Sequence, residues 1–234
     1  MPIKPILFNT EMVRALLEGR KTGTRRVVKP QPVLDGHLWK LDGAAWSDGV
    51  LSVPVMFGHS LYNRVPYQPG DVLYVRETFR VDCLSDIVRS GRVQYKADGS
   101  YANICFETAR YDIIRRAQSK PGWRPNENMP REAARIFLRV TGVRIERLQA
   151  IAEEDAKAEG AEKMYPYTDP ETGKTAFLLH EKGTYRAGFS QIWDSTIPKR
   201  PNMFDRYLYY WEYNPWVWVI EFERIGREEA KPTK

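Results

Sequence analysis

The chain has 234 residues, of which 42% are hydrophobic and 28% charged, with a formal net charge of +6 at pH 7. These proportions are typical of a globular protein and exclude a disordered or fibrous chain. No run of 18 apolar residues occurs, which excludes a membrane-spanning helix and predicts no membrane partner. The N-terminal segment lacks the apolar core and cleavage site of a signal peptide. With two cysteines, three scattered histidines and no CxxC or HExxH motif, the sequence predicts a cytoplasmic protein without metal or other cofactor.

Positive charge is concentrated in the first part of the chain. Residues 1–147 carry 24 basic and 15 acidic side chains, whereas residues 148–234 carry 12 and 15. Arginine supplies 23 of the 36 basic residues, and its planar donors suit phosphates and base edges. The imbalance favours an anionic partner, with nucleic acid as the first candidate, although a solvated basic surface has the same composition.

The N-terminal region is predicted to begin with one helix and a long loop. The apolar stripe in TEMVRALLE predicts a helix over residues 10–18, with Thr10 as its N-cap and Gly19 at its end. Residues 33–70 are rich in Gly, Pro, Asp and aromatic residues, which predicts a loop with short strands.

The middle of the chain is predicted to contain one clear strand and a long irregular stretch. The β-branched and aromatic run VLYVRETFRV predicts a strand over residues 72–81. Residues 82–134 are polar and predict irregular structure with a short helix near 107–117.

The C-terminal region is predicted to alternate strands and helices. ARIFLRVTGVRIERL predicts a second strand, bent at Gly142. TDPETGK predicts a turn, and a charged tail follows Gly226. The remaining elements are predicted as helices over residues 150–160 and 184–195 and a last strand over residues 216–225.

The densest cluster of chemically active groups is the segment GRKTGTRR, residues 19–26. Its guanidinium, ammonium and hydroxyl groups would suit a phosphate or a polar base edge. The spacing is not that of a P-loop. The competing interpretation is a solvated helix C-terminus whose cations oppose the negative end of the helix dipole.

Two carboxylates elsewhere are candidates for the same site. Glu159 precedes Gly160 at the end of a predicted helix, where the helix dipole disfavours an acid; pairing with a cation such as Lys21 would explain its position. Arg76 and Glu77 point to opposite faces of a predicted strand, which is also typical of a cross-strand ion pair.

The order of these motifs resembles the ASCH domain, a PUA-like β-barrel, and most of all the long ASCH proteins encoded in phages and prophages. The motifs are GRKT-x-T-x-R, GDVLYVRET, RIFLRVT, EEDAKAEG and WVWVIEF. The resemblance implies an α+β, mainly β fold: one small β-barrel over residues 1–226 with short flanking helices and a charged tail over 227–234. Insertions are expected near residues 30–69, 80–133 and 161–184.

The resemblance also implies a chemistry. Small bacterial ASCH proteins include the N4-acetylcytidine amidohydrolases, and their motif residues fall on Lys21, Thr24 and Glu159, here expected to be catalytic. Gly23 and Arg25 depart from the aliphatic residues of the small enzymes. The expected substrate- or nucleic-acid-binding residues are Arg20, Thr22, Arg25, Arg26, Arg76 and Glu77.

Three functions follow as hypotheses. The first is amide hydrolysis of an N4-acetylcytidine-like nucleoside or base. The second is a non-catalytic module that binds RNA or a modified DNA base, with single-stranded nucleic acid as its partner. The third is a ribonuclease, for which the sequence offers no histidine pair. Glu77 remains an alternative to Glu159 as the functional carboxylate, and Lys21 is either a base or an electrophilic cation.

Overall fold

The structure is a computed structural model that describes residues 3–108, 111–112, 114–115, 122–173, 175–197 and 209–230. The chain divides into two compact units. Unit 1 comprises Met1–Glu18, Asp71–Arg139 and Glu223–Lys234, and unit 2 comprises Gly19–Gly70 and Val140–Phe222. Strands predominate over helices in the described residues, which confirms the predicted mainly β, α+β class. The strand pairings of the described residues do not include a closed barrel.

Unit 1 contains a small sheet built around β7. Strand β1 (Lys4–Leu7) pairs in parallel with β7 (Val72–Arg76), and β7 pairs in antiparallel with the first residues of β11 (Phe137–Arg147). The predicted strand over residues 72–81 is interrupted, because pairing stops at Arg76 and resumes at Phe79 in the next strand.

Helix α1 (Thr10–Leu17) follows β1 in unit 1. Asn9, rather than the predicted Thr10, caps it, because the Asn9 side chain accepts a hydrogen bond of 2.9 Å from the backbone N–H of Met12. An Asn oxygen is as good an N-cap acceptor as a Thr hydroxyl, so the cap lies one residue earlier. Its Val13, Ala15 and Leu16 are buried, as the apolar stripe predicts.

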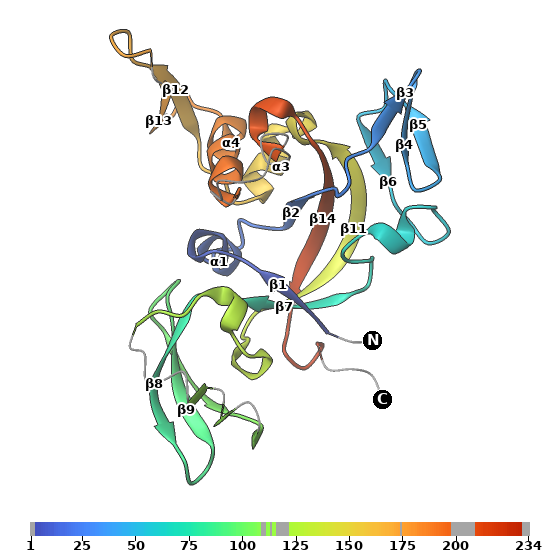
Figure 1. The fold of residues 1–234 in the computed structure, drawn as a ribbon. Coiled ribbons are helices and arrows are strands. Elements are labelled where there is room, and N and C mark those ends of the chain that lie inside the picture. Colours follow the sequence, from blue (N-terminus) through green and yellow to red (C-terminus); the bar gives the residue numbers. More distant parts are fainter. Residues whose placement is uncertain are drawn as a thin grey trace. The chain divides into compact units, whose positions relative to one another are not determined.

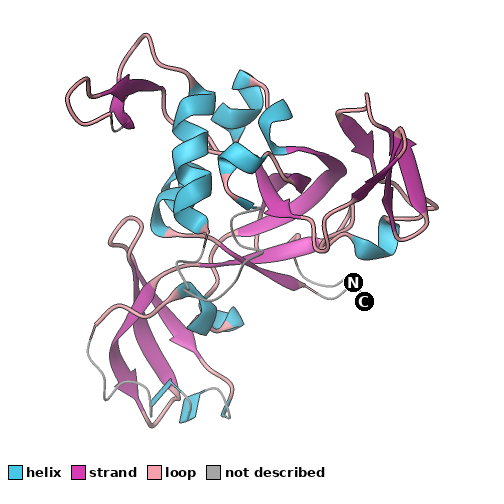
Figure 2. Ribbon diagram, turned by 45° about the horizontal axis from the view of Figure 1, so that its top comes forward, coloured by secondary structure: helices cyan, strands magenta, loops and turns pink. Residues whose placement is uncertain are grey.

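The prediction of irregular structure over residues 82–134 is wrong. Three antiparallel strands form a sheet there, β8 (Phe79–Ser85), β9 (Ser90–Tyr95) and β10 (Tyr101–Cys105) (Figures 1 and 2). Their inward side chains, among them Val93 and Ile104, form a buried cluster with Met129. The polar side chains that mislead the prediction lie on the outer face, as expected for a half-buried sheet. Much of the predicted helix near 107–117 lies outside the described residues.

Tyr95 connects this sheet to the segment before β11. It is fully buried, and its hydroxyl donates a hydrogen bond of 2.8 Å to the carbonyl of Ala133. Burial raises the pKa of Tyr95 to about 12, opposed by the nearby Arg135 guanidinium. Ionisation is therefore disfavoured more in the folded than in the unfolded chain.

We expect a loss of stability at high pH that depends on Tyr95. Because the folded pKa is raised, the contribution is fully present below pH 10 and is lost as pH rises from about 10 to about 12, by about 2 kcal/mol. Urea unfolding at several alkaline pH values measures it. Tyr95→Phe should remove most of this pH dependence, whereas Tyr101→Phe, at an exposed position, should leave it unchanged. An equal alkaline loss in both variants would assign the effect to other groups.

Unit 2 contains the strands that carry the candidate site. β2 (Gly23–Val27) pairs in antiparallel with β14 (Trp216–Ile225), and β6 (Ser52–Pro54) pairs with β11. The predicted last strand over residues 216–225 is confirmed. The predicted strand over residues 134–148 is also present, although pairing begins only at Phe137.

Two further small sheets occupy the predicted insertions of unit 2. Residues 30–69 form a three-stranded sheet of β3 (Val33–Asp35), β4 (Leu38–Leu41) and β5 (Ala44–Ser47). Residues 161–184 contain the hairpin of β12 (Met164–Thr168) and β13 (Thr175–Leu179), with the predicted turn between them. The 3₁₀ turns of the described chain are Tyr62–Arg64, Asn126–Asn128, Arg131–Ala133, Leu148–Ala150 and Trp211–Tyr213.

Helices α3 (Glu153–Ala158) and α4 (Tyr185–Thr196) pack on a common apolar cluster of unit 2. Val217 and Val219 of β14 contribute to this cluster with Phe189 and Trp193 of α4. The cluster joins α3 to the β14 face, and so fixes the position of Glu159 at the end of that helix. None of the helices in the described part of the chain is long and apolar enough to cross a bilayer.

Gly188 of α4 lies where no side chain fits. A Cβ atom there would lie 2.0 Å from the backbone oxygen of Glu162. Gly188→Ala should therefore lower the free energy of unfolding by about 1–3 kcal/mol, because the clash exceeds the gain of about 1 kcal/mol in helix propensity.

Thermal unfolding followed by circular dichroism measures this change. Gly49→Ala is the matched control, since a Cβ there meets only the Ser47 hydroxyl at 3.9 Å. An unchanged or raised melting temperature for Gly188→Ala would contradict the close approach.

Candidate functional site

Lys21 and Glu159 form a buried ion pair in unit 2. Their Nζ and Oε2 atoms lie 2.6 Å apart, and the two side chains are 0% and 3% exposed. The Lys21 ammonium also donates to the carbonyls of Gly23 at 2.7 Å and Glu159 at 2.9 Å. The pairing proposed to explain an acid at a helix C-terminus is therefore present.

Two glycines allow the chain to bring these residues together. Gly19 and Gly160 have φ values of 74° and 89°, in a backbone region that residues other than glycine rarely adopt. Gly19 ends the turn after α1, and Gly160 follows the last turn of α3. Between them the backbone N–H of Thr22 donates to the carbonyl of Ala158 at 2.8 Å, and Arg20 donates to the carbonyl of Gly160 at 3.0 Å. Arg20 and Thr22 thus hold the GRKT segment to the end of α3.

Arg25 is the centre of a network of carboxylates. Its guanidinium donates to Glu146 at 2.7 and 3.0 Å, to Asp155 at 3.0 Å and to Glu159 at 3.3 Å. Arg25 and Glu146 are almost completely buried. Arg25 was predicted to contact substrate, but most of its donors are used by these acids.

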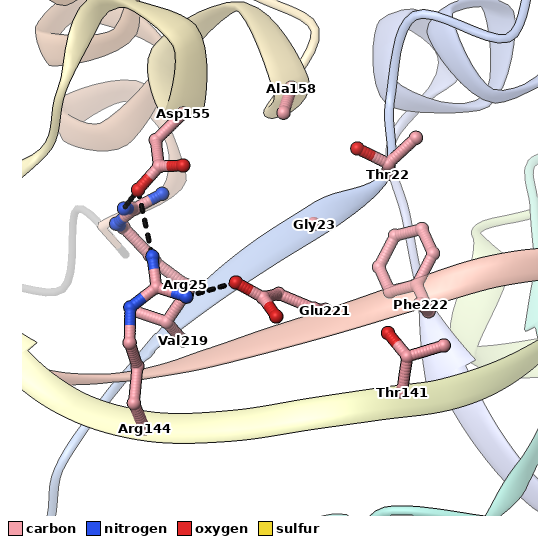
Figure 3. A pocket seen from close by; sticks show the side chains of 10 residues that line it. All are labelled: Thr22, Gly23, Arg25, Thr141, Arg144, Asp155, Ala158, Val219, Glu221 and Phe222. Carbon is pink, nitrogen blue, oxygen red and sulfur yellow. Dashed lines mark hydrogen bonds and ion pairs between the residues drawn. The ribbon is translucent and has the colours of Figure 1, made fainter. Parts of the chain in front are cut away.

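Arg144 extends the network to the protein surface. It donates to Glu146 at 2.9 Å and to Asp155 at 2.7 Å, and it is paired with Glu221. Figure 3 shows the Arg144 guanidinium reaching Asp155 of α3 and Glu221 of β14. Three cations, counting Lys21, face four carboxylates, so the network carries a formal excess of one negative charge.

A pocket of about 220 Å³ lies over this network. Its walls include Thr22, Arg144, Asp155 and Glu221 (Figure 3). Lys21 and Glu159 do not line this pocket, but they are hydrogen-bonded to Gly23 and Arg25, which do. A molecule in the pocket would meet the arginines and carboxylates first.

The two faces of β2 differ in chemistry. Because side chains alternate along a strand, Arg25 lies on one face, and Thr24 and Arg26 lie on the other. The cross-strand partners of Thr24 and Arg26 are Ile220 and Trp218. Thr24 is buried, with 1% of its surface exposed. Thr24 and Arg25 therefore lie on opposite faces of β2, although both are within four residues of Lys21 in the sequence.

Burial sets the electrostatics of Lys21 and Arg26. Desolvation lowers the pKa of Lys21, and the charge and hydrogen bond of Glu159 oppose this. Desolvation also lowers the pKa of Arg26, opposed by Tyr67 and Glu159. Glu159 is thus coupled to cations on both faces of β2, Arg25 and Arg26, and burial favours loss of the Lys21 proton.

Arg76 and Glu77 belong to unit 1. Glu77 accepts two hydrogen bonds of 2.8 Å from Arg135, which also binds Asp98 at 2.8 Å. Burial raises the pKa of Glu77, and Arg135 opposes the rise. Arg76 donates to the backbone carbonyls of Met129, at 3.0 Å, and Glu127. Both residues therefore have structural partners, and the ion-pair interpretation of Glu77 is present in the structure, with Arg135 as the cation.

Sequence reasoning missed the acids that surround Arg25. Glu146 lies within the predicted strand over residues 134–148, and Asp155 lies within the predicted helix over residues 150–160. The signal available was Arg144 and Glu146 in RIER, which lie on one face of a strand because they are two residues apart. No family model, curated protein or solved structure matches the chain.

Proposed function

We propose that residues 1–226 form a PUA-like ASCH domain that hydrolyses the N4-acyl group of a modified cytosine nucleoside or base. The observation that carries this proposal is the buried Lys21–Glu159 pair, with Nζ and Oε2 2.6 Å apart. Burial lowers the pKa of Lys21, so this lysine loses its proton more readily than an exposed one, because desolvation disfavours its charged form. General bases in enzymes are tuned in this way.

In the proposed reaction, Lys21 moves the proton and Thr24 supplies the nucleophile. Lys21, held by Glu159, first loses its proton to solvent. The Thr24 hydroxyl then attacks the acyl carbon while its proton goes to Lys21, which stabilises the oxyanion as a cation. Lys21 gives that proton to the exocyclic nitrogen as the C–N bond breaks. Water then hydrolyses the Thr24 ester, which releases the carboxylic acid and restores the hydroxyl.

Two observations support this assignment: the ASCH-like motifs supply the three residues, and a hydrogen bond brings the two motifs together in the structure. GRKT-x-T-x-R contributes Lys21 and Thr24, and EEDAKAEG contributes Glu159. The hydrogen bond between Thr22 and Ala158 joins the two motifs in space.

The test is release of cytidine from N4-acetylcytidine, followed by chromatography. The wild-type chain is expected to turn over, and Lys21→Met should lower kcat/KM by at least about a hundredfold. Lys40→Met is the matched control, because Lys40 is an exposed lysine paired with Asp35, and it should keep full activity. Thr24→Val provides a second variant that retains the buried charges.

Each outcome bears on the proposal. No turnover by the folded wild-type chain would overturn the hydrolase. Turnover that survives both Lys21→Met and Thr24→Val would place the reaction elsewhere in the molecule. Loss of turnover in both variants, with circular dichroism spectra like that of the wild type, is the expected result.

A further inference from the structure

Arg147 lies against two tryptophans in unit 2, outside the Lys21 site. Its guanidinium carbon is 5.0 Å from the ring centroid of Trp39 and 5.3 Å from that of Trp216. The two rings pack edge to face, with centroids 5.5 Å apart. Trp39 comes from the sheet of residues 33–47, Arg147 from the end of β11 and Trp216 from the start of β14. Three separate segments therefore fix the position of this guanidinium.

The guanidinium donors of Arg147 have no acceptor among the residues that the structure describes, although its backbone N–H donates to the carbonyl of Leu51 at 3.3 Å. This differs from Arg25, whose donors contact three carboxylates. Burial lowers the pKa of Arg147, and Asp48 opposes this only through its charge. Asp48 instead accepts the indole N–H of Trp39 at 2.7 Å. A half-buried guanidinium held by cation–π contacts, with its donors open, is a preformed site for an oxyanion.

A pocket of about 360 Å³ lies beside Arg147. Its walls also include Arg186, whose guanidinium donates to the carbonyl of Gln149 at 2.8 Å. Leu51, 61% exposed, and the Trp39 ring give the pocket an apolar side. Two arginines and one carboxylate leave a formal charge of +1, in contrast to the negative excess of the Lys21 network.

We infer that this pocket, bounded by Trp39, Arg147 and Arg186, binds a phosphate and the adjoining base of a single-stranded nucleic acid. The two guanidiniums contact the phosphate, and the base stacks on Trp39 and Leu51. A planar guanidinium makes bidentate bonds to phosphate oxygens, and stacking on an aromatic ring suits every base. An acidic peptide would offer the charge but not the flat ring. The inference does not require hydrolysis at Lys21.

The test is fluorescence anisotropy of the full chain with a fluorescein-labelled oligocytidylate of about twelve nucleotides, a length in the range that one binding surface covers. Arg147→Met keeps an unbranched stem between the rings and removes the charge. We expect it to weaken binding about tenfold and to reduce the slope of log K against log salt by about one. Arg186→Met, at an exposed position, should reduce the slope by a similar amount.

The matched control is Arg92→Met. Arg92 also stacks on an aromatic ring, with its guanidinium carbon 5.0 Å from the Tyr101 centroid, but its donors bind Asp82 at 2.6 and 3.1 Å. This variant should bind like the wild type. The inference is overturned if Arg147→Met and Arg186→Met also bind like the wild type. It is overturned equally if cytidine monophosphate or oligoglutamate competes as well as unlabelled oligocytidylate. Because the probe lacks an acyl group, its binding and the release of cytidine can fail independently.

Discussion

Replacing Arg25 by methionine is expected to lower the free energy of unfolding by about 3–5 kcal/mol at neutral pH. Methionine fills a similar volume, so the loss arises from charge rather than from a cavity. Without the guanidinium, Glu146 keeps only Arg144, and Glu159 keeps only Lys21 among the described cations that bond to it. The buried carboxylates then repel one another in a medium that screens charge poorly.

Urea unfolding of the wild-type chain and the variant measures this loss. Arg139→Met is the control, because Arg139 is an exposed arginine, 3.3 Å from Glu223, and should change stability by no more than about 1 kcal/mol. The double variant Arg25→Met, Glu146→Leu should recover part of the loss, since it removes one of the buried carboxylates that repel one another. A loss of less than about 1 kcal/mol in Arg25→Met would contradict the network's role, and so would the absence of coupling in the double variant.

The elements that the sequence predicts best are those with one strong periodicity. The apolar stripe around Phe189 and Trp193 predicts α4, and the run from Trp216 to Ile225 predicts β14. Strands β8 to β10 were missed because they are short, polar on one face and separated by charged turns. Their inward residues, such as Val93 and Tyr95, become a core only when three strands pair. Single-strand patterns do not carry that information.

The candidate site could likewise be predicted only in part from the sequence. The pairing of Lys21 with Glu159 could be predicted, because an acid at the C-terminal end of a helix is stabilised by a nearby cation. The role of Arg25 could not be predicted, since Glu146 is separated from it by 121 residues and only the sheet, in which β14 lies between β11 and β2, brings them together. For the same reason the alternation of β2 places Thr24 and Arg25 on opposite faces, whereas the motif alone groups them in one loop.

Replacing Glu159 by glutamine is expected to move the pH profile of turnover to lower pH and to lower its maximum about a hundredfold. Glu159 raises the pKa of Lys21 through its charge and its hydrogen bond, and burial lowers it. Glutamine keeps an oxygen for the hydrogen bond but removes the charge, so burial prevails and the pKa of Lys21 falls further. More Lys21 is then neutral at any given pH, and the rising limb of kcat/KM shifts to the acidic side. The maximum falls because a lysine with a lower pKa is a weaker base, and because Lys21 loses the carboxylate that holds it in place.

Measurement of kcat/KM for N4-acetylcytidine across pH separates this role of Glu159 from a structural one. Glu154→Gln removes an exposed acid from the same helix and should leave the profile unchanged. If Lys21 acts only as a permanent cation, its protonation has no rising limb to shift, and Glu159→Gln would lower turnover equally at every pH. That uniform loss would overturn Lys21 as the base while keeping it in the site. An acidic shift confined to Glu159→Gln follows only if Lys21 must lose its proton before it acts as the base.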